Sequence, residues 1–245
     1  SLLGRKCARD LWYTFRWATL SQFPGRILRL FNRGHLEEGR LVSLLEMIGC
    51  TVYQFDENGD QYRISGHGGH YGGGLDCVIV GLPEMPDTPV LGEFKTHSDK
   101  SFTKLVNDGL YSSKFEHYAQ MVQYMGEHKL AYGLYLACNK NDDDLYAEII
   151  AYDPGVHNGA SERAGRIIDS PDPPQRISKT STWYECKFCS HHAVCWMKKA
   201  PDVNCRTCAF SVPAPDGQWW CRKHDASLDK AMQLRACADY TEKEG

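Results

Sequence analysis

Residues 89–97, with the sequence PVLGEFKTH, form the stretch that decides the fold. Its apolar residues are typical of a β-strand. Side chains alternate between the two faces of a strand, so Glu93 and Lys95 project together while Phe94 projects from the opposite face. This pair of charges on one face of an apolar strand is the leading candidate for a functional site.

The runs around this strand predict a mixed sheet with helices. Short apolar or alternating runs separated by turn residues are typical of strands, and they lie at 51–55, 62–65, 75–82, 130–138 and 145–153. Helical apolar spacing covers 7–20, 36–49, 113–128 and 158–169. The second of these helices ends at Gly49, a residue suited to a helix C-terminus. The order of elements predicts an α/β fold with a mixed central sheet flanked by helices.

Length and composition set the domain organisation. The chain has 245 residues, 42% of them hydrophobic, which is enough for one substantial core and a small appended module. Residues 169–178 contain three prolines and cannot continue the preceding helix. We predict a main domain over 1–170, a proline-rich linker over 171–184 and a cysteine-rich module over 185–245. Metal rather than a core is expected to order that module.

Charge and hydropathy exclude few partners. A formal net charge of -3 neither indicates nor excludes nucleic acid, because a local basic groove can serve inside an acidic protein. No stretch approaches the roughly 18 apolar residues of a membrane helix. The N-terminus carries charges where a secretory peptide has its apolar centre. We therefore expect a soluble, cytoplasmic protein with no membrane partner.

Asp76, in the run at 75–82, adds a second acid to the candidate site. If this strand neighbours the one at 89–97, Asp76 joins Glu93 and Lys95. Two carboxylates and a main-chain carbonyl, here that of Phe94, are the hard oxygen ligands that Mg²⁺ or Mn²⁺ prefers. A nearby lysine can orient a metal-bound water or help to deprotonate it.

The acid-x-Lys triplet is short enough to occur by chance. An acid-x-Lys triplet arises about once or twice in a chain of ordinary composition, and it recurs here at Glu127-x-Lys129 and Glu185-x-Lys187. Those two lie in a polar helix end and a cysteine segment. The Glu93 instance lies on an apolar strand that follows another strand bearing an acid, which favours it as the functional one.

Two helices supply further candidates. Gly34-x-x-x-Glu38 spans the start of the helix at 36–49, and Gln120 and Tyr124 lie one turn apart on one face of a second helix. Taken alone, Glu38 fits a solvated helix charge and Tyr124 a core aromatic. Glu37 leaves a one-residue ambiguity, which the spacing to Gly34 resolves in favour of Glu38.

These motifs, in this order, resemble those of the RecB-family nucleases of the PD-(D/E)xK class, which include YqaJ-type viral recombinases and CRISPR-adaptation nucleases. The resemblance covers roughly residues 5–195 and departs from the usual pattern at Leu75, which stands where proline is common. It implies a restriction-endonuclease-like core. It also implies the roles of the site residues: metal ligation by Glu38, Asp76 and Glu93, service to the attacking water by Lys95, and positioning of the DNA backbone and active site by Gln120 and Tyr124.

The eleven cysteines, seven of them between Cys186 and Cys237, indicate metal sites rather than disulfides. Cys186-x2-Cys189-x5-Cys195 supplies three thiolates, and a cluster needs a fourth. One N-terminal cysteine, Cys7, together with this C-terminal triplet resembles the 4Fe-4S staple of AddB and of the CRISPR-adaptation nucleases. A zinc site that uses His191 or His192 is the alternative.

A second group of cysteines follows the first. A structural zinc site fits this group, with His224 as an alternative to the last ligand and a second iron-sulfur cluster as an alternative to zinc. Three further cysteines have apolar contexts and are expected to be small core residues. The proposed zinc ligands are Cys205, Cys208, Cys221 and Cys237, and the core cysteines are Cys50, Cys77 and Cys138.

Basic residues flank both halves of the acidic site and are candidate phosphate contacts. They are Arg26, Arg29, Arg33 and Arg40 around the first catalytic helix, and Lys100, Lys104 and Lys114 after the Glu-x-Lys strand. A solvated charge run is the alternative. The glycine-rich segment 66–74 leads into a strand and lacks phosphate-loop spacing, so we expect a flexible hairpin or a DNA-facing loop.

The motifs together predict a deoxyribonuclease that uses Mg²⁺ or Mn²⁺, contains a 4Fe-4S cluster and carries zinc in its tail. By resemblance it is an exonuclease acting on linear or single-stranded DNA ends in recombination, repair or phage DNA processing. A recombination partner and a bacterial or phage-infected host cell are further expectations from this likeness. The alternative is a catalytically inactive nucleic-acid-binding protein that keeps the fold and metal sites as a scaffold. A redox protein is disfavoured because no dinucleotide fingerprint is present.

Overall fold

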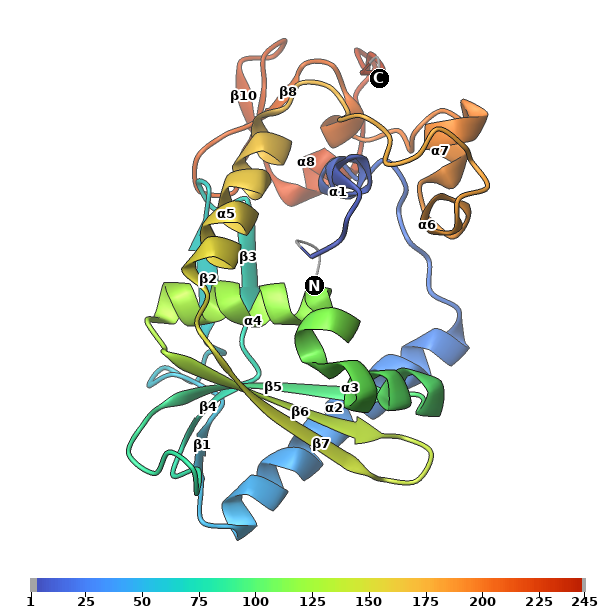
Figure 1. Cartoon of the computed structure of the whole chain (residues 1–245). Helices are drawn as coiled ribbons and strands as arrows, with labels where there is room; N and C mark the ends of the chain where they lie inside the picture. The colour runs from blue at the N-terminus through green and yellow to red at the C-terminus, as the bar shows by residue number, and fades with distance from the viewer. Residues whose placement is uncertain (1–3, 244–245) are drawn as a thin grey trace.

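A five-stranded mixed sheet forms the centre of the protein (Figure 1). The structure is a computed structural model and describes residues 4–243. The strand order is β1-β4-β5-β6-β7, with β5 and β6 parallel and the other neighbours antiparallel. The strands are β1 (Thr51–Tyr53), β4 (Cys77–Val80), β5 (Val90–His97), β6 (Tyr132–Asn139) and β7 (Leu145–Ala151). The predicted α/β fold with a mixed central sheet flanked by helices is confirmed.

Helices cover both faces of this sheet. Helix α2 (Gly25–Met47) buries Leu41 and Leu45 in a cluster with Phe94 on one face. Helices α3 (Asp99–Ser113) and α4 (Phe115–His128) bury apolar side chains on the other. Each fully buried aliphatic or aromatic side chain contributes about 1.5–3 kcal/mol, so these two clusters fix the helices on the sheet. No helix in the described part of the chain is both long and apolar enough to cross a bilayer.

Helix α3 was not predicted from the sequence. Gly109 interrupts it with φ 73° and ψ 171°, so two short helical pieces meet at a kink. Only Phe102, Leu105 and Leu110 of its residues are buried, so its apolar pattern is sparse. The helices that the sequence did predict are present as α1 (Ala8–Phe15), α2, α4 and α5 (Pro154–Asp169).

The N-terminal helix packs against the C-terminal part of the chain rather than against the central sheet (Figure 1). The indole Nε1 of Trp12 donates to the carbonyl of Ser170 at 3.0 Å, and Arg206 donates to the carbonyl of Phe15 at 3.1 Å. The side-chain amide of Asn204 donates to the carbonyl of Trp17 at 3.0 Å. The two ends of the described chain therefore form one structural unit.

Short elements make up the C-terminal module. A three-stranded sheet of order β10-β9-β8 surrounds Trp219, which is fully buried. Its small apolar cluster contains Trp219, Cys221 and Leu228, with Phe15 of α1 packed against it. The elements are α6 (Tyr184–Lys187), α7 (His192–Met197), η1 (Cys205–Thr207), β8 (Ser211–Pro213), β9 (Trp219–Cys221), β10 (Ala226–Leu228) and α8 (Lys230–Leu234).

The glycine-rich segment forms the hairpin of β2 (Arg63–Gly66) and β3 (Tyr71–Gly74), which connects the core to the C-terminal module. At its tip the backbone N–H of Gly217 donates to the carbonyl of Gly68 at 2.6 Å. The ring Nε2 of His70 lies 2.6 Å from the carbonyl of Ala214. The expected hairpin is therefore present, and its tip is held by the module through backbone and side-chain contacts.

Gly69 provides a test of this contact. Its φ is +83°, and an added Cβ would lie 2.5 Å from the backbone nitrogen of Gly217. Gly59 has a similar φ of +82° with open space around it. We expect Gly59→Ala to lower the free energy of unfolding by about 1 kcal/mol through backbone strain alone.

Gly69→Ala is expected to cost clearly more, because the tip must also move away from Gly217. Chemical denaturation measures both variants, and limited proteolysis shows whether the C-terminal module becomes accessible in Gly69→Ala. Equal destabilisation of the two variants would mean that the hairpin tip contributes nothing to holding the module.

Candidate active site and cysteine clusters

Asp76 and Glu93 meet where strands β4 and β5 begin to diverge. The last paired residues are Cys77 and Gly92. Asp76 directly precedes Cys77 and Glu93 directly follows Gly92, so the two acids lie beside the same end of the paired region. The Oδ2 atom of Asp76 accepts a hydrogen bond from the backbone N–H of Phe94 at 2.8 Å. The expected neighbourhood of the two strands is thus present, and it brings both carboxylates to the same point.

Lys95 places its ammonium among three oxygen atoms. Its Nζ lies 2.5 Å from Oε1 of Glu93 and 3.6 Å from Oδ2 of Asp76. It also donates to the carbonyl of Phe94 at 2.8 Å. A cation therefore occupies the point on which two carboxylates and one main-chain carbonyl converge.

Burial and mutual charge shift the protonation of this group. Glu93 is fully buried, and burial raises its pKa to about 7, with Lys95 opposing the shift and Asp76 adding to it. Burial also lowers the pKa of Lys95, but the nearby carboxylates outweigh it, so the pKa of Lys95 is raised overall. Lys95 is therefore a permanent cation at neutral pH, whereas Glu93 can exchange a proton.

Helix α4 brings Gln120 and Tyr124 to the same acid. The side-chain amide of Gln120 donates to both oxygens of Glu93, at 3.1 and 3.3 Å, and to the hydroxyl of Tyr124 at 3.3 Å. Gly73 of the β2–β3 hairpin lies against that hydroxyl, since an added Cβ would be 2.2 Å from it. The two residues form a contiguous polar row that ends on Glu93.

Helix α2 contributes Glu38 from the opposite side. Glu38 and Lys95 line one cavity of about 290 Å³, and the charge of Glu38 contributes to the raised pKa of Lys95. Glu37 lines the same cavity but accepts a hydrogen bond from Arg40 at 2.7 Å. Of the two acids, Glu38 is therefore the one whose charge acts on the Lys95 group.

Sequence reasoning missed a buried polar network beside this site. The hydroxyl of Tyr135 lies 2.8 Å from a ring nitrogen of His97 and 2.8 Å from one of His117. Burial, followed by nearby lysine charges, lowers the pKa of His97 to about 4 and that of His117 to about 3. The alternation that places Glu93 and Lys95 on one face of β5 continues to His97, and this pattern was the available signal.

The predicted phosphate contacts are scattered. Arg33 donates to the carbonyl of Lys140 at 2.8 Å, and Arg40 is bonded to Glu37, so both are tied to the protein. Lys114 donates to the hydroxyl of Ser101 at 2.7 Å and lines a cavity of about 870 Å³ together with Lys104. Lys100 is exposed at the start of α3. The structure does not gather these side chains into one patch.

The first cysteine group comes together from both ends of the chain. Cys7, Cys186, Cys189 and Cys195 all line the 870 Å³ cavity. Burial is the main cause of the raised pKa of Cys186, and charges on Cys7 and Cys195 add to it. Burial likewise raises the pKa of Cys189 to about 12. The four thiols thus face one cavity, and a metal centre there would stabilise their ionised form.

Neither neighbouring histidine is oriented by these thiols. The Nε2 atom of His191 lies 3.0 Å from the hydroxyl of Thr14, and Nδ1 of His192 lies 2.8 Å from the carbonyl of Cys186. The buried Nδ1 of His191 has no hydrogen-bond partner among residues 4–243, and both histidines line the same cavity as the four cysteines. Cys7 and a histidine therefore both stay open as the fourth ligand.

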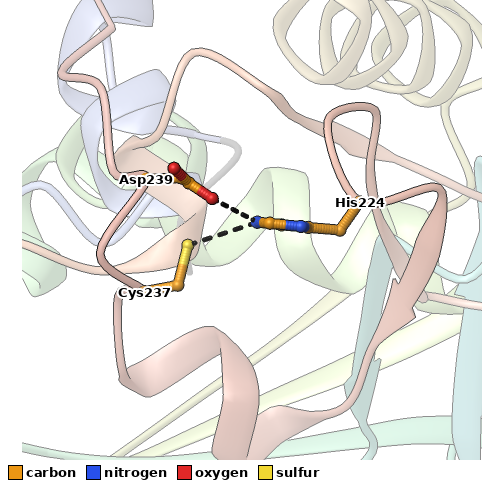
Figure 2. A group of neighbouring side chains, drawn as sticks. All are labelled: His224, Cys237 and Asp239. Carbon is orange, nitrogen blue, oxygen red and sulfur yellow. Dashed lines mark hydrogen bonds and ion pairs between the residues drawn. The ribbon is translucent and has the colours of Figure 1, made fainter.

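The second cysteine group also converges. Burial raises the pKa of Cys205, and charges on Cys237, Cys208 and Cys221 add to it. Figure 2 shows the exposed side of this group, where Nε2 of His224 lies 3.6 Å from Sγ of Cys237 and 3.2 Å from Asp239. The structure therefore places both alternatives for the last ligand, Cys237 and His224, at the same point. Cys50, Cys77 and Cys138 are buried, as expected of core residues.

Comparisons with known proteins add little to this geometry. No protein-family model and no curated protein matches the chain. Among solved structures, the chain is similar to the crystal structure of SSO0001, with 18% sequence identity and a TM-score of 0.49 over 81% of this chain and 85% of that one. This similarity is too distant to assign a function.

The pH dependence of stability tests the environment of Glu93. A carboxyl with a raised pKa in the folded state stabilises the fold at low pH, and that contribution is lost as pH rises from about 4.5 through about 7. Glu93→Gln removes the titration. In the presence of a chelator, we expect the free energy of unfolding of the variant minus that of the parent to increase by roughly 2–3 kcal/mol between pH 5 and pH 8.

Denaturant unfolding of both proteins at several pH values gives this difference, and contributions of the buried histidines cancel in the comparison. A difference that does not change with pH would show that Glu93 titrates as an ordinary surface carboxylate.

Proposed function

We propose that this protein is a metal-dependent deoxyribonuclease of the PD-(D/E)xK class with a restriction-endonuclease-like core. One observation carries the proposal: the Lys95 ammonium lies among the oxygens of Glu93, Asp76 and Phe94. These are hard oxygen donors, and the group already binds a cation, so they fit Mg²⁺ or Mn²⁺. Glu38 lines a cavity together with Phe94 and Lys95, and would complete the acidic set.

The metal, when bound, would supply Lewis-acid stabilisation of charge on the phosphate and lower the pKa of a water ligand. Glu38, Asp76, Glu93 and the Phe94 carbonyl would hold it. Lys95 would then give up its position among these oxygens. Beside them, its ammonium would orient the attacking water or help to deprotonate it, and it would stabilise negative charge.

Gln120 and Tyr124 have a positioning role in this scheme. Two hydrogen bonds from one amide fix the plane of the Glu93 carboxylate, and the bond to Tyr124 fixes the amide in turn. The β2–β3 hairpin backs the Tyr124 hydroxyl through Gly73. A ligand carboxylate held in one orientation binds metal without first losing conformational freedom.

Cleavage of end-labelled linear DNA in Mn²⁺ or Mg²⁺ tests the activity. We expect Glu93→Gln and Lys95→Met each to lower the rate about 100-fold or more, since each removes charge from the reacting centre. Glu127→Gln is the matched control, because it alters the second Glu-x-Lys triplet, away from the site, and is expected to retain activity.

Cleavage that persists in Glu93→Gln would refute the site. DNA binding without cleavage by the metal-loaded parent protein would instead support the inactive scaffold. The form of the products separates an exonuclease, which the family resemblance favours, from an endonuclease.

The cysteine groups complete the proposal. Four thiols from the two chain ends fit a 4Fe-4S cluster that joins α1 to the segment after the proline-rich linker. The second group fits a structural zinc ion. By the family resemblance, the protein acts on DNA ends in recombination, repair or phage DNA processing, in the cytoplasm of a bacterial or phage-infected cell and with a recombination partner.

Metal content of anaerobically purified protein tests both centres. We expect Cys189→Ser to lose iron and keep zinc, and Cys221→Ser to lose zinc and keep iron, because each removes one ligand of a different site. Cys50→Ser, in the core, is the control and should keep both. A colourless, iron-free parent protein with two zinc ions would overturn the cluster.

A further inference from the structure

A set of apolar side chains is exposed on the N-terminal half of α2 and at Phe23, which lies two residues before that helix. Phe23 and Phe31 are 52% and 48% exposed, and their rings meet edge to face with centroids 5.1 Å apart. The buried residues of this helix, by contrast, all lie in its C-terminal half. We name Phe23, Leu30 and Phe31 the aromatic platform. Exposed aromatics grouped in this way mark an interaction site more often than an ordinary surface.

The aromatic platform lies between two cavities. Leu30 and Phe31 line the 290 Å³ cavity that contains Glu38 and Lys95. Phe23 lines the 870 Å³ cavity on its other side. The Phe23–Phe31 contact therefore connects the candidate active site to the larger cavity.

The larger cavity, which also contains the four cysteines of the first group, has aromatic and basic side chains in its lining. Exposed aromatic side chains from three further places line it, namely Phe115, Tyr184 and Phe188. Basic side chains line it from separate segments, namely Arg5, Lys6, Arg9, Lys104, Lys114 and Arg176. Its acids include Asp10, which pairs with Arg5 at 2.9 Å, and Glu185, which lies 3.6 Å from Lys6.

The chain around the platform is also free of acids. No Asp or Glu occurs between Asp10 and Glu37. The segment that carries the platform therefore adds no negative charge of its own, although Asp10, Glu116 and Glu185 line the larger cavity. This favours nucleic acid over an acidic or neutral protein surface as the occupant.

Taking the proposed nuclease function as its basis, we propose that the aromatic platform stacks unpaired bases of single-stranded DNA on their way to the acidic site. Sequence-independent single-strand sites combine basic side chains with exposed aromatic rings, because every base has a face that can stack. Paired bases have no free face inside a duplex, so the platform selects unpaired ends.

Equilibrium binding in chelator tests this proposal without cleavage. The probes are a fluorescent oligothymidylate and a blunt DNA duplex, measured by fluorescence anisotropy. We expect Phe23→Ala with Phe31→Ala to weaken oligothymidylate binding about 10-fold or more and to leave duplex binding unchanged. The control Leu36→Ala changes a residue of the same helix that is 70% exposed and lines neither cavity, so it should bind as the parent does.

A second pair of variants separates stacking from simple apolar contact. Phe23→Leu with Phe31→Leu keeps the apolar surface but removes both rings, and we expect it to bind oligothymidylate as weakly as the alanine pair. Phe23→Trp with Phe31→Trp keeps an aromatic ring at both positions and should bind as the parent does. Unchanged oligothymidylate affinity in the alanine pair, or a change in oligomeric state with normal affinity, would overturn the proposal and identify the platform as a contact between copies.

The two proposals fail separately. Loss of single-strand binding in the variants, together with no cleavage by the parent in Mn²⁺, would leave the platform in place and refute the nuclease. Normal cleavage and normal single-strand binding in all variants would refute the platform and keep the nuclease.

Discussion

The candidate site depends on a buried carboxylate that is balanced by one cation. Glu93 is fully buried, and an ionised carboxylate without a partner there would be very costly. The Lys95 ammonium offsets part of this cost, and the pKa of Glu93 is raised to about 7. Gln120 adds two hydrogen bonds to the same carboxylate. The proposed metal chemistry would rest on the same buried charge.

The sheet and most of its helices could be predicted, because their apolar periods are local properties of the sequence. The proximity of Asp76 and Glu93 could also be predicted, because each acid lies in a run of residues with a recognisable strand pattern. Helix α3 was missed because few of its residues are apolar and buried, and Gly109 interrupts it. The His97–Tyr135–His117 network was missed because it joins three elements, and only its strand residue follows a pattern that can be read locally.

Contacts of the glycine-rich hairpin could not be predicted for a similar reason. Nothing near residues 66–74 indicates that residues 214–217 lie against the tip, because that pairing depends on how the C-terminal module folds. The hairpin touches the module at its tip and Tyr124 near its base. It thus forms a rigid connection between a unit expected to bind metal and the polar row that ends on Glu93.

The packing of α1 against the C-terminal module has a consequence for biosynthesis. A ribosome releases Trp12 and Phe15 early, but their partners Ser170, Arg206 and Trp219 emerge only after the whole central sheet has been made. The aromatic side chains of α1 therefore have no native partners while most of the chain is translated. Chaperones or transient contacts with the nascent core have to shield them, and the final docking step comes late in the life of the polypeptide.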